Sequence, residues 1–181
     1  GRRSFRNVIG HVEGVSDLSS LSAWVGEAFD LEFSWDDVSE VKELWGGKLI
    51  LKGIMDEEDA EMAVKCGADA LVVSNHGGRQ LDGAPSAISM LPSIVDSVGH
   101  RTEIWLDGGI RSGQDVLKAL GLGAKGTLIG RPYLYGLGAL GEEGVSLCLN
   151  IIKRELDLSM ALCGHVDINQ VSSDIIKFTN L

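Results

Sequence analysis

The sequence predicts an α/β fold with a parallel sheet, and two observations support this expectation. Short runs of aliphatic and β-branched residues recur along the chain, and each is followed by a segment with helical spacing of its apolar residues. The run Ala-Leu-Val-Val at 70–73 lacks polar alternation, which is typical of a strand buried on both faces of a parallel sheet. Because crossovers between parallel strands are right-handed, four such units form either an open sheet or part of a barrel.

The expected elements can be placed in chain order. Residues 1–34 are expected to form a loop and helix segment, with a short helix near 18–25, that leads into one domain at 35–181. Ser34 and the acids after it predict the start of a helix that ends near Gly46. Strands are then expected at 48–54, 70–74, 103–107 and 126–130, alternating with helices at 56–66, 86–98, 112–122 and 144–162.

Composition limits the classes of protein to which the chain can belong. Its 181 residues are 44% hydrophobic, enough for one domain with a core, and no apolar run approaches the roughly 20 residues that cross a bilayer. The net charge of -10 argues against a nucleic-acid partner. Three separated cysteines without a CxxC pair predict no disulfide framework and no metal site. With no targeting segment at Gly1-Arg2-Arg3-Ser4, we expect a reducing, cytoplasmic location.

The stretch at 74–82 places a base, a flexible backbone and a cation at the end of a buried strand. His76 can take and hold a proton near neutral pH. Gly77 and Gly78 allow the backbone to approach a flat ligand, and the planar guanidinium of Arg79 suits a carboxylate. A base beside a carboxylate clamp suggests a small acid that reacts next to its carboxyl group. Taken alone, the stretch could equally be a glycine turn with a capping histidine and a solvated arginine.

The other predicted strand ends carry compatible groups. Lys52 lies within an apolar run, where its charge is costly to bury unless it faces a ligand, a partner or water. The segment 107–113 combines glycines with Arg111 just before an expected helix start, and Gly130 and Arg131 follow the last strand. Arginines, glycine amides and a helix start together predict a phosphate cradle. In eight-stranded barrels such a site usually lies at the last two strand ends.

These segments carry a resemblance to a known family. The stretch 74–82, with 51–53, 107–111 and 129–131, resembles the FMN-dependent α-hydroxy-acid dehydrogenases and oxidases, over most of the chain from Trp35 to Gly164. Family members, which include glycolate oxidase, mandelate dehydrogenase and flavin L-lactate dehydrogenases, fold as (β/α)8 TIM barrels. The chain therefore looks like the C-terminal half of such a barrel, about four β/α units, and its segments 1–7 and 161–164 look closest to bacterial L-lactate dehydrogenases.

The resemblance implies a role for each matching residue. His76 would be the active-site base, and Arg79 would bind the substrate carboxylate. Lys52 would stabilise the anionic reduced flavin, Ser74 would contact the ring system, and Asp107 would bond the ribityl hydroxyls. The remaining cofactor-binding residues, which would hold FMN chiefly through its phosphate, are Gly108, Gly109, Arg111, Gly130 and Arg131.

The implied reaction is oxidation of a small L-2-hydroxy acid, with L-lactate as the expected substrate, to the 2-oxo acid. Two electrons pass to FMN, and His76 takes a proton either from the α-carbon or from the hydroxyl group. Oxygen, a quinone or a cytochrome would accept the electrons. The resemblance also implies a homo-oligomer and a peripheral contact with the cytoplasmic face of the inner membrane.

The chain is short for this family. A complete barrel needs roughly 250 residues, and the segments recognised here correspond to its second half. The family's first four strands bring tyrosines to the substrate and an aspartate to the histidine. We therefore expect a piece of a longer enzyme; the alternative is an inactive half-barrel that binds FMN or phosphate only weakly.

Overall fold

The computed structural model describes residues 11–28 and 30–177. The chain divides into two compact units, residues 1–37 and 38–181. In the first unit, helix α1 (Leu18–Ala28) begins after Asp17, whose carboxylate accepts a 2.8 Å hydrogen bond from the amide of Ser20. The short helix expected near 18–25 is therefore confirmed.

Helix α2 (Trp35–Trp45) begins in the first unit and continues into the second. The sequence predicts that Ser34 caps this helix. In the structure the Ser34 amide and hydroxyl both donate to the carboxylate of Asp37, at 2.6 and 2.7 Å. These bonds lower the pKa of Asp37, with the hydroxyl contributing most. Ser34 thus lies at the start of the helix and donates two hydrogen bonds to Asp37 in its first turn.

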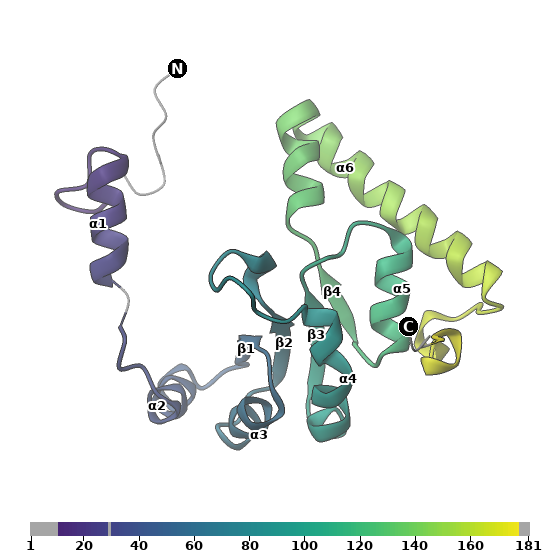
Figure 1. The fold of residues 1–181 in the computed structure, drawn as a ribbon, viewed down its shortest axis with the longest axis horizontal. Coiled ribbons are helices and arrows are strands. Elements are labelled where there is room, and N and C mark those ends of the chain that lie inside the picture. Colours follow the sequence, from purple (N-terminus) through teal and green to yellow (C-terminus); the bar gives the residue numbers. More distant parts are fainter. Residues whose placement is uncertain (1–10, 29, 178–181) are drawn as a thin grey trace. The chain divides into compact units, whose positions relative to one another are not determined.

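The second unit is built on a four-stranded parallel sheet. Its strands β1 (Ile50–Ile54), β2 (Ala70–Ser74), β3 (Glu103–Asp107) and β4 (Gly126–Leu128) lie in sequence order (Figure 1). Helices α3 (Glu57–Lys65), α4 (Ala87–Val98) and α5 (Gly113–Gly121) connect successive strands. Right-handed crossovers between neighbours in this order place these helices on the same face of the sheet. The α/β fold predicted from the sequence is confirmed.

Strand β2 is the centre of the core. All five of its residues are buried, as the sequence pattern at 70–73 predicts. Leu91 and Ile94 of α4 are fully buried, as is Leu106 of β3. The prediction of a buried strand at 48–54 is wrong for most of its length, because β1 is the outer strand of the described sheet and Ile50 is 48% exposed.

The start of β1 is fixed by one carboxylate. Asp69, just before β2, accepts bonds of 2.6 Å each from Lys42 of α2 and from Lys48, and one of 2.9 Å from the amide of Leu49. The bond from Lys42, followed by that from Lys48, holds the pKa of Asp69 far below its usual range. These contacts join α2, the beginning of β1 and the loop before β2.

Helix α6 (Arg131–Leu162) differs from the prediction. The sequence predicts a strand to residue 130 and a helix from 144, whereas β4 ends at Leu128 and α6 already begins at Arg131. The glycines between these points suggest a loop, but they serve a helix pair bent at Gly141. Gly136 and Gly144 touch so closely that a Cβ atom on Gly144 would lie 1.9 Å from the Gly136 carbonyl oxygen.

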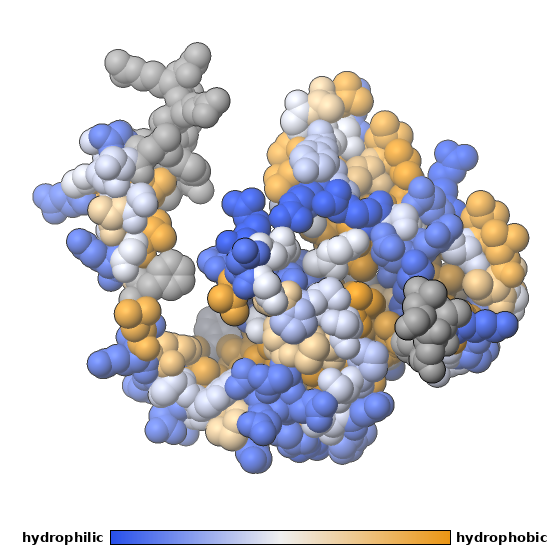
Figure 2. Space-filling model, viewed as in Figure 1, coloured by the Kyte–Doolittle hydropathy of each residue, from blue (hydrophilic) through white to orange (hydrophobic). Residues whose placement is uncertain are grey.

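Much of α6 is apolar and exposed. Figure 2 shows orange side chains along it, and the exposed residues are Leu134, Tyr135, Leu137, Leu140, Leu147, Leu149, Ile151, Leu158 and Leu162. After α6 the described chain continues through two short 3-10 turns, Ile168–Gln170 and Ser173–Ile175. Among the described residues, no helix is both long and apolar enough to cross a bilayer.

Candidate active site

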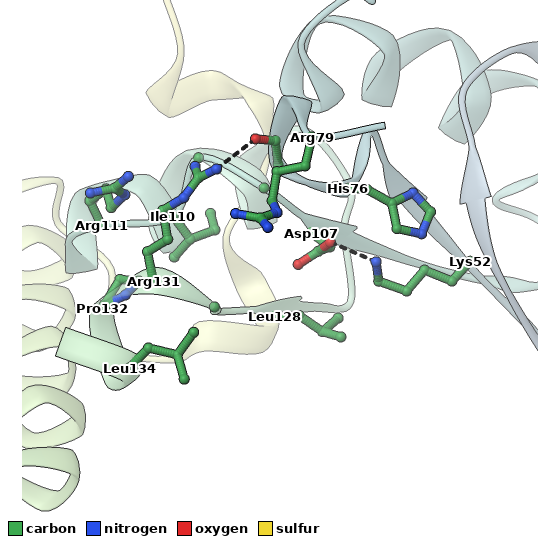
Figure 3. A pocket seen from close by; sticks show the side chains of 14 residues that line it. Lys52, His76, Arg79, Asp107, Ile110, Arg111, Leu128, Arg131, Pro132 and Leu134 are labelled. Carbon is green, nitrogen blue, oxygen red and sulfur yellow. Dashed lines mark hydrogen bonds and ion pairs between the residues drawn. The ribbon is translucent and has the colours of Figure 1, made fainter. Parts of the chain in front are cut away.

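A pocket of about 370 Å³ lies at the carboxyl ends of the strands (Figure 3). The parallel register aligns Ser74 of β2 with Asp107 of β3, and Asp107 with Leu128 of β4. The pocket is lined by Lys52, His76, Gly77, Arg79, Asp107, Gly108, Gly109, Ile110, Arg111, Leu128, Gly130, Arg131, Pro132 and Leu134. Every site residue predicted from the sequence therefore lines this pocket, with the exception of Ser74.

Ser74 lies beneath the pocket as the centre of a polar network. It is 1% exposed, and its hydroxyl donates to the carboxylate of Asp107 at 2.6 Å while accepting from the Lys52 ammonium at 3.1 Å. Lys52 also pairs directly with Asp107 at 2.9 Å, as Figure 3 shows. The charge of Lys52, whose side chain is 38% exposed, is thus balanced by a carboxylate. The three side chains come from three neighbouring strands and fix one another.

The network sets the charge state of Asp107. Burial by itself raises the pKa of this carboxyl group, but the hydrogen bonds from Ser74 and Lys52, together with the positive charge of Lys52, outweigh it. The net result is a lowered pKa, so Asp107 is ionised at neutral pH. Lys52 therefore faces the pocket as a cation held in place by a permanent anion.

His76 opens a tight turn after β2. It begins a 3-10 turn, η1 (His76–Gly78), with a left-handed φ of 55°, which is uncommon for a residue with a side chain. Its amide donates to the Ser74 hydroxyl at 3.1 Å. The imidazole lies over Gly53 of β1, where a Cβ atom would come within 3.3 Å of the ring. Gly53 was missed by the sequence analysis, although a glycine within a strand typically marks such a close approach.

Arg131 connects this turn with the opposite side of the pocket. Its guanidinium donates to the carbonyl oxygen of Gly77 at 2.9 Å, drawn as a dashed line in Figure 3. Arg131 is the first residue of α6, and Pro132 follows it at a position that proline favours in helix starts. Gly130, before it, makes no side-chain capping bond.

The first turn of α5, which follows Arg111, is bonded to two carboxylates. Asp115 accepts from the amides of Arg111 and Ser112, at 3.0 Å each. The amide of Gly113 donates to Glu155 of α6 at 2.9 Å. The amides of Arg111, Ser112 and Gly113 are therefore already bonded to carboxylates. The start of α6 provides the helix terminus of the pocket instead.

The pocket is strongly positive within an acidic chain. Four cations line it, Lys52, Arg79, Arg111 and Arg131, against the single carboxylate of Asp107, which leaves an excess of three positive charges. The whole chain carries -10. Among the described residues, the guanidinium of Arg79 has no hydrogen-bond or ion-pair partner. Such a lining is suited to ligands that bring several negative charges, such as a phosphate together with a carboxylate.

Several lining residues escaped the sequence analysis. Leu128 faces the pocket because of its register with Asp107, and Ile110, Pro132 and Leu134 add apolar surface. Apolar residues near a strand end carry no chemical signature in the sequence, so only the fold could identify them. Ligand pockets generally combine such apolar walls with a few polar groups.

Comparison with known proteins identifies the family. A family model described as FMN-dependent dehydrogenase matches residues 3–178. The chain belongs to this family. It is 45% identical over 170 residues to an L-lactate dehydrogenase of Caulobacter vibrioides, covering 94% of this chain and 44% of the relative. It is also 45% identical over 161 residues to 2-hydroxyacid oxidase 1 of Mus musculus, covering 89% of this chain and 44% of that protein.

Solved structures agree with this family membership. The fold superimposes on (S)-mandelate dehydrogenase, a monotopic membrane protein, with a TM-score of 0.85 and 38% identity, covering 92% of this chain and 44% of the other. The crystal structure of mandelate oxidase with benzoyl-formic acid superimposes with a TM-score of 0.74 and 45% identity. The match covers 77% of this chain and 42% of that chain. The chain spans less than half the length of these relatives. Its four βα units are thus part of a TIM barrel, and the predicted partial barrel is confirmed.

The pocket residues fit the cofactor of this FMN-dependent family. FMN joins a flat ring system to a phosphate through a ribityl chain. The α6 start with Arg131, and Arg111 on the same side of the pocket (Figure 3), provides positive charge for a phosphate. A Cβ placed on Gly109 or Gly130 would have no described atom beyond its chain neighbours within 4 Å. Lys52 lies on the other side of the pocket, beside His76 (Figure 3). A volume of about 370 Å³ falls within the range of cofactor sites.

Proposed function

We propose that the chain is the FMN-binding half of an enzyme that oxidises an L-2-hydroxy acid to the 2-oxo acid. The observation that supports it best is one pocket that contains a base, His76, the paired ammonium of Lys52, and Arg79, whose guanidinium has no partner within residues 11–28 and 30–177. Family membership supports the same chemistry. The relatives span more than twice the matched length, so we place the remaining substrate contacts in the part of the protein outside this chain.

When bound, FMN supplies the two-electron acceptor for this reaction. Arg111 and Arg131, with Gly109 and Gly130, would hold its phosphate at the start of α6. Lys52 would bring positive charge to the ring as negative charge accumulates there. We propose that Asp107 and Ser74 serve chiefly to orient Lys52, because both already bond its ammonium group and Ser74 is buried.

Arg79 and His76 would act on the substrate. Arg79 would bind the carboxylate through its planar guanidinium and so place the α-carbon beside the imidazole. His76 would then take a proton on a ring nitrogen, either from the α-carbon or from the α-hydroxyl group. This arrangement assigns binding and proton transfer to neighbouring residues of one loop.

L-lactate is the substrate we propose to test first, because L-lactate dehydrogenases are among the relatives. The relatives include both dehydrogenases and oxidases, so oxygen, a quinone or a cytochrome are the acceptors to compare. We also propose assembly as a homo-oligomer and peripheral association with the cytoplasmic face of the inner membrane. The monotopic (S)-mandelate dehydrogenase supports the membrane contact by analogy.

The test is a visible absorbance spectrum of the purified protein before and after anaerobic addition of L-lactate. A flavin spectrum that bleaches is the expected result. His76→Gln should keep the bound flavin but prevent bleaching, whereas His100→Gln, at an exposed turn, should bleach like the wild type. A bound flavin that no small 2-hydroxy acid reduces would favour the alternative of an inactive half-barrel. Absence of flavin after reconstitution would contradict the proposed cofactor site.

A further inference from the structure

Asn75, between β2 and His76, has a side chain that contacts both ends of the active-site loop. The amide of Gly78 donates to the Asn75 side-chain oxygen at 3.2 Å and to its backbone oxygen at 3.0 Å. The side-chain nitrogen donates to the carbonyl oxygen of Pro85 at 3.0 Å. Pro85 lies just before α4, so one amide group connects the beginning of the 76–85 loop with its end.

The loop needs such an anchor because its backbone is unusual. His76, Gly77 and Gly78 all have positive φ values, 55°, 67° and 69°. A residue with a side chain adopts this region only when its surroundings hold it there. His76 and Arg79 are both exposed, so packing around their side chains contributes little to their placement. Hydrogen bonds to the loop backbone are therefore the main restraint on where these two side chains point.

We infer that Asn75 is a positioning residue for His76 and Arg79. It is not among the residues that line the pocket, and it acts by fixing the loop that carries both residues. The role requires an amide, because the oxygen accepts from Gly78 while the nitrogen donates to Pro85; aspartate can supply only the first bond and alanine neither. The inference rests on the proposed function for its kinetic consequence, although the loop restraint itself is independent of catalysis.

The restraint is tested first on the protein without flavin or substrate. Hydrogen–deuterium exchange of peptides covering residues 75–86 should be about tenfold faster in Asn75→Ala than in the wild type, because loss of two bonds of ordinary strength raises the open population by at least this factor. Asn75→Asp, which retains the acceptor, should fall between them. Asn150→Ala, a matched change at an exposed position of α6, should exchange like the wild type. Unchanged exchange in Asn75→Ala would overturn the inference whatever the enzyme does.

The kinetic consequence is measured on the flavin-loaded protein by rapid-reaction spectroscopy. Asn75→Ala should slow flavin reduction by about 10- to 100-fold, as expected when a base is misplaced. Flavin occupancy and the melting temperature should remain within error, and Asn75→Asp should recover part of the rate. A reduction rate within twofold of the wild type would contradict the positioning role, as would loss of flavin together with the fold. If the wild type itself is not reduced, the proposed function fails while the exchange result still decides the role of Asn75.

Discussion

Helices α5 and α6 begin near the same pocket but have very different first turns. At α5, Ser112 and Asp115 form a reciprocal capping box, and Glu155 of α6 accepts from the amide of Gly113. At α6, Gly130 makes no side-chain capping bond and Arg131 reaches across the pocket to Gly77. Amides at the start of α5 donate to carboxylates, whereas arginines lie beside the start of α6.

The proposal that α6 rather than α5 provides the anion site rests on this difference. Helix N-termini attract anions through their free amides and positive dipole end. At α5 that attraction is already used by Asp115, whose negative charge would repel a phosphate. At α6 it remains available beside the guanidinium groups of Arg111 and Arg131. Proximity to a glycine-rich loop therefore does not suffice to identify an anion site; the side chains that occupy the amides decide.

The largest effect is expected for Gly113→Ala at the α5 start. The new Cβ atom would lie 2.0 Å from the amide nitrogen of Leu156, a backbone atom that cannot move aside alone. Overpacking of this kind costs about 1–3 kcal/mol and sometimes more, and we expect the upper end of that range. Urea unfolding of the variant measures it.

Gly130→Ala is the matched control at the α6 start, where no described atom beyond the chain neighbours lies within 4 Å of the added carbon. Its stability should change by less than about 0.5 kcal/mol, as is usual for a surface substitution. Equal losses in the two variants would mean that the helix starts do not differ in packing as described.

The second prediction concerns ligand binding at α6. Arg131→Ala removes a cation from the proposed phosphate site, and a hydrogen bond to a charged group contributes about 1.5–3 kcal/mol. FMN affinity, measured by quenching of flavin fluorescence, should therefore fall by about 10- to 100-fold. Arg154→Ala, an exposed arginine farther along α6, removes the same charge from the chain. If both variants weaken binding equally, net charge rather than the α6 start would be responsible.

The sequence predicts which polar residues gather in the pocket because their signals are local. Lys52, His76, Asp107 and Arg131 each follow or end an apolar run, and the parallel register then brings them into one pocket. The roles assigned to them are still predictions. Position along a strand was enough to locate these residues, since parallel strands expose their carboxyl ends at one edge.

The misses have a common physical origin in long-range contacts. The early start of α6 was overlooked because Gly136 and Gly144 suggest a loop, whereas they allow two helical arms to touch. At the start of α5, the amide of Gly113 donates to Glu155, which is 42 residues away in the sequence. The exposure of β1 depends on which strand neighbours it. None of these contacts leaves a pattern within a short window of sequence.

A smaller effect is expected from the α5 cap itself. Ser112→Ala removes the hydroxyl that accepts from the amide of Asp115 at 3.3 Å, and loss of such a cap costs about 1 kcal/mol. Ser86 occupies the same position at α4, where its hydroxyl donates to that of Ser89 at 3.0 Å but makes no capping bond to a helix amide, so Ser86→Ala should cost clearly less. FMN affinity should stay within about twofold in Ser112→Ala if α5 is purely structural. A marked loss of affinity there, with stability unchanged, would assign the phosphate to α5.

The smallest expected effect is the pH dependence of stability that arises from Asp107. This residue ends strand β3 and belongs to neither helix start. The pKa of Asp107 is lowered in the folded protein, because its bonds to Ser74 and Lys52 outweigh the opposing effect of burial. An unfolded aspartate has a pKa of about 3.9, so the unfolded chain binds a proton at Asp107 more readily than the folded protein does. The contribution of Asp107 to the free energy of unfolding is therefore present above about pH 4 and is lost as pH falls through the folded pKa. Lys52 is 38% exposed, so water screens the pair and the effect should stay below that of the α5 cap.

Urea unfolding of the wild type and Asp107→Asn should give a constant difference in the free energy of unfolding from pH 7 down to about pH 5, and a shrinking one below about pH 4. A difference that grows on acidification would mean that Asp107 is held protonated, and that Lys52 has another counter-charge.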